Sequence, residues 1–115
     1  MWICSDLHRR RIERHNGLIN AIVVSCLARA RAHAGATDAA RARGEDRPLL
    51  GLPMTLKESM NVRDLATTCG MAEWREARAE ASGPVAERVA AAGAVLLGKT
   101  DEPPMLADWQ SDNPV

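Results

Sequence analysis

The sequence predicts an α/β protein in which short strands alternate with helices. Two apolar runs, 52–57 and 94–98, each follow a glycine and end at or beside a lysine. Short apolar runs that alternate with segments of helical composition are typical of layered α/β architectures. The unit formed by 52–57, 84–92 and 94–98 predicts a parallel pair of strands joined by a right-handed helical crossover.

The helical segments are recognised by their start and stop signals. Ser5 or Asp6 caps the first helix, and Asn16-Gly17 stops it. Ser25 is the expected cap of a long helix rich in alanine and arginine, and Ser82 is the expected cap of the crossover helix. The expected helices span about 6–16, 26–44, 73–80, 84–92 and a short segment from Pro103.

Three strands are expected, at 18–24, 52–57 and 94–98. The first is partly β-branched, and Pro53 lies near the start of the second, where a missing N–H group is tolerated. The third is a continuous apolar run, as in a strand buried on both faces, so it requires a neighbour on each side. With so few strands and two unprotected edges, residues 1–115 are expected to form a single partial domain, a fragment of a larger fold.

Composition argues against several classes of function. Lys plus Arg and Asp plus Glu both total 15, so the formal net charge is +0, whereas a general nucleic-acid binder would show a basic excess. The absence of Phe and Tyr argues against a base-stacking platform. Three widely spaced cysteines indicate reduced thiols, and the sequence shows neither a signal peptide nor a membrane span. We therefore expect a cytoplasmic protein without a nucleic-acid or membrane partner.

Lys57 is the first candidate for chemistry, because the chain has only two lysines, Lys57 and Lys99. In the plain interpretation, the side chain of Lys57 reaches from the end of a strand into water. In the functional interpretation, Lys57 lies in a protected site that lowers its pKa, because desolvation favours the neutral amine and a neutral amine can act as a base. Composition does not decide between them.

Four other groups of residues are explained more simply as ordinary structure. The metal candidates lack further ligands, and the basic run lies in a chain without net charge. Nothing fixes the geometry of the acidic group, and the glycine–lysine motif is only the tail of a phosphate-binding loop. These groups are Cys4, His8 and His15 for a metal, 8–11 with Arg14 for phosphate, Asp101, Glu102 and Asp108 as paired carboxylates, and Gly98-Lys99-Thr100 as a phosphate loop.

Four segments in register resemble the N-terminal part of the amidase signature family. They read LINAIV, PLLGLPMTLKE, TTCG and GAVLLGKTD, and a further match, DWQSDNP, closes the chain. The resemblance covers nearly the whole chain from about Arg11 onward. It implies the N-terminal part of an α/β/α fold, with a few strands of a mixed sheet flanked by helices, and a hydrolase of small-molecule carboxamides that needs neither cofactor nor metal.

The resemblance also implies a role for Lys57, which ends the family's Gly-x-Pro-x-x-x-Lys segment. The amine would take a proton from a serine in a cis peptide, and that serine would activate a nucleophilic serine. An arginine could not substitute, because its guanidinium stays protonated. The family's Gly/Ser-rich segment with both serines is not among these residues, so the chain alone is expected to be inactive.

The chain departs from the family pattern at three positions. Glu58 stands where many members have Asp, Met71 where Ser is common, and Pro104 where an acidic residue is frequent. These differences leave the substrate open. Two alternatives remain: a non-catalytic binding or assembly subunit that kept Lys57 for packing, and a small α/β interaction domain that folds by itself.

Overall fold

The computed structural model describes residues 2–115 and their side chains from Asp6 onward. α1 begins at Trp2, so Ser5 and Asp6 lie inside the helix and the cap predicted at either residue is wrong. The metal ligand expected at Cys4 lies outside the described side chains. Residues 2–115 contain three α-helices, three strands and two short 3₁₀ helices. Their bounds are α1 Trp2–Ile19, β1 Ile22–Ser25, α2 Leu27–Ala42, β2 Pro53–Lys57, η1 Ala72–Trp74, α3 Pro84–Ala91, β3 Val95–Thr100 and η2 Pro104–Leu106.

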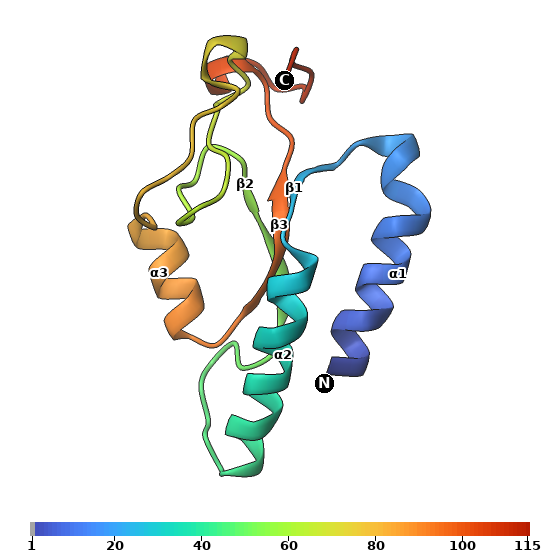
Figure 1. The fold of residues 1–115 in the computed structure, drawn as a ribbon, viewed down its shortest axis with the longest axis vertical. Coiled ribbons are helices and arrows are strands. Elements are labelled where there is room, and N and C mark those ends of the chain that lie inside the picture. The colour runs from blue at the N-terminus through green and yellow to red at the C-terminus, as the bar shows by residue number, and fades with distance from the viewer. Residues whose placement is uncertain (1) are drawn as a thin grey trace.

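The strands form one mixed sheet with β3 in the centre (Figure 1). β2 pairs with β3 in parallel, from Pro53 opposite Val95 to Lys57 opposite Thr100. β1 pairs with β3 in the antiparallel direction. The predicted parallel pair and the mixed sheet are therefore confirmed, and β3 has the two neighbours that its apolar sequence requires.

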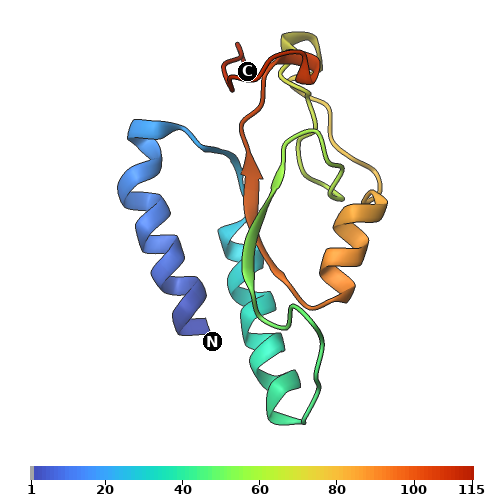
Figure 2. The ribbon, with the colours of Figure 1, turned by 180° about the vertical axis from the view of Figure 1, so that it is seen from behind.

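The helices enclose the sheet from two sides. α1 and α3 lie on opposite sides of it, and α2 lies between them beside β3, as Figures 1 and 2 show from front and back. Successive strand residues face opposite sides, so β3 contributes to two apolar clusters. Val95 and Leu97 pack with Ala30 and Ala34 of α2, whereas Leu96 packs against a second cluster. That second cluster consists of Leu56, Val62 and Ala86.

β1 pairs with only the last part of β3. The N-terminus of α2 contacts the preceding residues on the same edge of β3. The N–H group of Cys26, the N-cap of α2, donates to the carbonyl oxygen of Leu97 at 3.1 Å, and the thiol of Cys26 donates to the carbonyl of Leu96 at 3.2 Å. Gly98 makes the close approach of β1 feasible, because a Cβ atom there would lie 2.5 Å from the carbonyl oxygen of Val24.

The first helix ends later than predicted, and Asn16 has a different function from the expected stop. α1 runs through Asn16 to Ile19 and ends before Asn20, whose φ of 45° is left-handed. The side chain of Asn16 accepts the N–H of Ile22 at 2.8 Å and donates to the carbonyl of Ile22 at 2.9 Å. Asn16 therefore fixes the turn into β1, and the strand expected at 18–24 begins only at Ile22.

The helix expected at 73–80 is wrong except for the single 3₁₀ turn η1. Beyond it, the chain pairs with the segment before it instead of coiling. The N–H of Ala79 donates to the carbonyl of Leu65 at 3.1 Å, and the N–H of Asp64 donates to the carbonyl of Ala79 at 2.8 Å. These tertiary bonds satisfy backbone groups that a helix would otherwise have paired locally.

The two serine caps were also predicted one residue too early. Cys26 and Gly83 occupy the N-cap positions of α2 and α3, and Ser82 instead accepts the N–H of Arg63 at 3.0 Å. The end of α2 is as expected: Gly44 has a φ of +82°, the left-handed conformation that commonly follows a helix C-terminus.

We expect these 115 residues to be marginally stable and prone to aggregate. The cause is two bare edge strands, β1 and β2, since the central strand β3 has a neighbour on each side. Leu18 and Ile19 add exposed apolar surface, with 88% and 68% of their area accessible. Thermal unfolding followed by light scattering should show concentration-dependent aggregation. A sharp, reversible transition of a monomer would instead support a domain that folds by itself.

Candidate functional site

Lys57 is the last residue of β2 and lies opposite Thr100, at the carboxyl end of the parallel pair. This end of parallel strands is where open α/β sheets commonly bind ligands. The side chain of Lys57 is exposed, and within residues 6–115 it has neither a hydrogen bond nor an ion pair. Lys57 thus presents its amine at an edge suited to ligands, but it is not in the protected setting that the functional interpretation required.

Glu58, the residue that follows, is only 4% exposed. Its carboxylate accepts the backbone N–H groups of Thr68 at 2.7 Å and Cys69 at 3.0 Å. Glu58 therefore attaches the loop 66–70 to the end of β2, directly beside Lys57.

Glu102 and Lys99 lie next to this contact, and both have 0% of their surface exposed. Glu102 accepts the N–H of Ser59 at 3.0 Å. The amine of Lys99 donates to the hydroxyl of Thr67 at 2.9 Å and to the carbonyl of Ala66. We call Glu58, Lys99 and Glu102 the buried charge cluster; it connects β3, the turn after Lys57 and the loop 66–70.

Burial shapes the ionisation of this cluster. It lowers the pKa of Lys99 because the charged amine is desolvated, while Glu58 and Glu102 act in the opposite direction by stabilising that charge. The same burial raises the pKa of the nearby Cys69 thiol, and both carboxylates reinforce this shift. The cluster is thus a lysine between two acids, in which Coulomb attraction partly offsets the cost of desolvation.

One atom of the cluster remains unused by the protein. Oε1 of Glu102 is buried and has no hydrogen-bond partner among the described residues. Glu102 and Glu58 line a cavity of about 110 Å³ together with Asn113. The cluster therefore retains one buried acceptor that no described residue satisfies.

Sequence reasoning singled out Lys57 as a candidate and missed the cluster. The protected lysine with a lowered pKa is Lys99, whose motif had indicated only the tail of a phosphate loop. The available signal was the rarity of lysine: only two occur, one in each of two paired strands and one position out of register with each other. Glu58 and Glu102 had no comparable signal, because burial of an acid is not visible in a local pattern.

The weaker candidates do not form sites in the described residues. No group of three or more His, Cys, Asp or Glu side chains there could hold a metal ion. The basic run of α1 is partly neutralised, because Asp6 pairs with Arg9 and Arg10, and hydrogen bonding to Arg9 lowers the pKa of Asp6. Asp101 binds the side-chain amide of Asn113 at 2.6 Å rather than another carboxylate. No helix in residues 2–115 is long and apolar enough to cross a membrane.

The two lysines provide a matched test of the cluster. We expect Lys99→Met to lower the free energy of unfolding severely, by roughly the 3–5 kcal/mol that removing one partner of a buried charge pair costs, because Glu58 and Glu102 would be left buried without a counter-charge. Lys57→Met should leave stability nearly unchanged, since its amine has no partner. Chemical denaturation of the two variants measures both effects, and equal stabilities would contradict the cluster.

The pH dependence of stability in the wild type and in Lys99→Met gives an independent check on the cluster. The folded pKa of Lys99 lies below its ordinary value of 10.5, so between the two the unfolded chain holds a proton that the folded chain has lost. Stability of the wild type relative to Lys99→Met should therefore rise with pH through that interval and level off near 10.5. A difference that falls with pH would show that the folded state raises the pKa of Lys99 instead of lowering it.

Comparison with known proteins gives consistent matches. The sequence profile named Amidase matches residues 7–115. A glutamyl-tRNA(Gln) amidotransferase subunit of Synechococcus sp. (strain WH7803) is 42% identical over 98 residues, which cover 84% of this chain and 20% of that protein. The putative amidase AmiB2 of Mycobacterium tuberculosis (strain H37Rv) is 37% identical over 101 residues, which cover 88% of this chain and 22% of that protein.

Solved structures agree with the sequence matches. A chain from a vestigial protein complex, studied for the origins of an s-triazine catabolic enzyme, superimposes with a TM-score of 0.83 and 35% identity over 90% of this chain and 23% of its own length. The peptide amidase of Stenotrophomonas maltophilia gives 0.82 and 25% over 90% of this chain and 22% of its own. The chain thus spans only about a fifth of the curated relatives' length, for example 20% of the Synechococcus protein.

Proposed function

The chain belongs to the amidase family, and from this premise we propose that Lys57 is the general base of a carboxamide hydrolase. The observation that carries the proposal is the position of Lys57, an unpartnered lysine at the carboxyl end of parallel strands, in the segment GLPMTLK that resembles the family's lysine motif. A base must reach its substrate or a relay group, and an exposed amine at this edge can do so.

The proposed reaction converts a small carboxamide into a carboxylic acid and ammonia or an amine. The neutral amine of Lys57 takes a proton from a serine in a cis peptide, which in turn deprotonates a nucleophilic serine. The nucleophile attacks the amide carbonyl and forms an acyl-enzyme, which water hydrolyses. Backbone N–H groups of a Gly/Ser-rich segment stabilise the oxyanion. Neither serine is assigned to a residue of this chain.

The buried charge cluster supports the assignment of the base to Lys57. The amine of Lys99 is already engaged by Ala66 and Thr67 and is inaccessible, so it cannot meet a substrate. Glu58 and Glu102 hold the turn that directly follows Lys57. In this proposal, Lys99 stabilises the carboxyl end of the sheet, and Lys57 extends from that end with its amine exposed.

A second proposal is favoured by the relatives. Several of them are named as one subunit of an amidotransferase, which describes a member of an assembly. This chain would then serve for binding or assembly, and Lys57 would have no chemical role. Cytoplasmic location and a carboxamide substrate likewise remain predictions.

A segment exchange tests the proposed function. Residues 11–115 would replace the matching segment of the Mycobacterium tuberculosis protein AmiB2, and ammonia release from simple carboxamides would be measured. We expect the chimera to retain turnover that depends on Lys57. If a folded chimera keeps the same turnover when Lys57 is substituted, Lys57 is not the base and the assembly proposal is favoured.

A further inference from the structure

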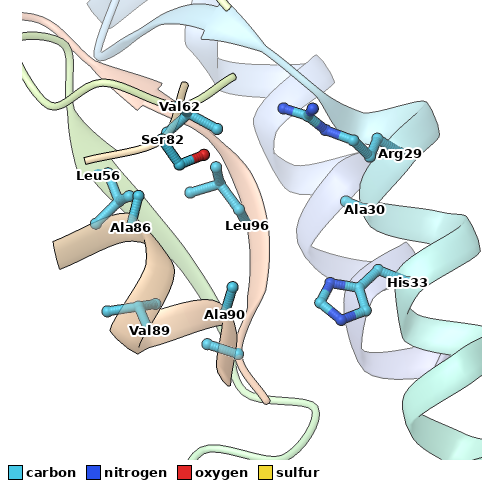
Figure 3. A pocket seen from close by; sticks show the side chains of 11 residues that line it. Arg29, Ala30, His33, Leu56, Val62, Ser82, Ala86, Val89, Ala90 and Leu96 are labelled. Atoms are coloured by element: carbon cyan, nitrogen blue, oxygen red, sulfur yellow. The ribbon is translucent and has the colours of Figure 1, made fainter. Parts of the chain in front are cut away.

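A second cavity lies away from Lys57, between α2 and α3 on one side of the sheet. It has a volume of about 190 Å³. Figure 3 shows Leu56 and Leu96 of the sheet at its base, with α3 on one side and α2 on the other. Its lining is apolar except on the side of α2 and at Ser82. We call it the α2–α3 cavity.

Two side chains of α2, Arg29 and His33, supply the polar groups on that side. They are four residues apart and therefore share a face of the helix, and Figure 3 shows both extending from α2 beside the cavity. The guanidinium of Arg29 donates to the carbonyl of Arg63 at 3.3 Å and also lies within hydrogen-bonding reach of the Cys26 sulfur, and the remainder of its five N–H donors is available to a ligand. Among the described residues, the ring of His33 has no hydrogen-bond partner.

The charge around the cavity has one sign. Residues 27–37 of α2 contain two arginines, one histidine and no acid, and no lining residue is acidic. A ligand there would meet hydrogen-bond donors on one side and hydrocarbon on the others. This pattern suits a group with an anionic end and an apolar body, because a guanidinium binds a carboxylate with two parallel hydrogen bonds.

The volume limits the size of the ligand. At about 30 Å³ for each water molecule in the liquid, the cavity holds roughly six waters, and it is smaller than the roughly 300–1,000 Å³ of sites for drug-sized ligands. A fatty acid of biological chain length or a nucleotide would not fit, whereas a carboxylate with a few carbon atoms would.

We propose that the α2–α3 cavity binds a small carboxylate with a short hydrocarbon chain, held by Arg29 and His33 at its charged end and by Leu56, Leu96 and α3 along its body. Lys57 does not line this cavity, so the proposal is independent of the proposed hydrolase function.

Binding of hexanoate to the 115-residue chain tests the proposal by ligand-observed NMR, at micromolar protein to limit aggregation. We expect a dissociation constant on the order of 1 mM, given so few ligand atoms. Arg29→Gln should weaken binding about tenfold or more, since it removes a charge-assisted contact. Arg43→Gln, at the C-cap of the same helix, is the matched control, because Arg43 pairs with Glu45 and does not line the cavity. This variant should bind hexanoate like the wild type.

Three further measurements make the result decisive. Ala90→Leu adds bulk at the cavity wall with a good helix former and should abolish binding while circular dichroism is unchanged. Hexanamide, equal in chain length but neutral, should not bind at concentrations where hexanoate does. Equal binding of hexanamide, competition by inorganic phosphate as strong as by hexanoate, or wild-type affinity of Arg29→Gln would each overturn the proposal.

Discussion

Replacing Lys57 by alanine or arginine in the chimeric amidase should lower kcat by about 10³-fold or more, with little change in folding. A positioned general base typically contributes about 10²–10⁴-fold, and groups that act as a unit in a serine-based relay lose most of their effect together when one is removed. Arginine retains the positive charge and much of the length but cannot accept the proton. Lys57→Arg should therefore lower kcat as much as Lys57→Ala.

The exposed position of Lys57 makes this experiment interpretable. Its side chain has no partner in the described residues, so its removal leaves no buried group unsatisfied. Arg78→Ala, another exposed cation whose contacts are local carbonyls, is a suitable control and should leave kcat unchanged. Turnover of Lys57→Arg close to that of the wild-type chimera would exclude a proton-accepting role and leave only a role for charge.

Local signals in the sequence predicted most of the fold. Gly44 and Pro84 set helix ends through their own backbone restrictions, and the apolar run before Lys99 could only be a buried central strand. The errors arose where residues distant in the sequence determine the local backbone structure. The segment 73–80 has helical composition, but Leu65 and Asp64 bind its backbone instead. Asn16 was predicted to end the first helix, but its side chain instead forms two hydrogen bonds with the backbone of Ile22, six positions later.

The same contrast between local signals and distant contacts applies to the candidate site. Lys57 was singled out because its motif is local and the resemblance placed it in register, and its role as the base stays a prediction. The buried charge cluster depends on the turn after β2, the loop 66–70 and the end of β3 coming together, and Glu58 and Glu102 are separated by more than forty residues from one another in the chain. No pattern within a single segment predicts that Lys99 is fully buried while Lys57, in the neighbouring strand, is exposed.

The 115 residues by themselves should hydrolyse no amide. Lys57 can supply a base, but the described serines are engaged elsewhere or lack a relay. Ser82 accepts the N–H of Arg63, and the hydroxyl of Ser111 donates to the carbonyl of Asp101 at 3.4 Å. No serine of the sequence lies in a glycine-rich segment of the kind that would place backbone N–H groups around an oxyanion.

The backbone N–H groups nearest the cluster do not replace such a segment. Those of Thr68 and Cys69 already donate to Glu58, and that of Gly70 donates to the hydroxyl of Thr68. Loss of one oxyanion donor alone typically costs about 10²–10³ in rate, so lack of the donors and of both serines together should leave no measurable turnover. Labelling with a serine-reactive fluorophosphonate and an ammonia-release assay on simple carboxamides test this directly. Stoichiometric labelling of one serine, with turnover that vanishes in Lys57→Ala, would show that the nucleophile is among these residues and that the relay is built differently from the proposed one.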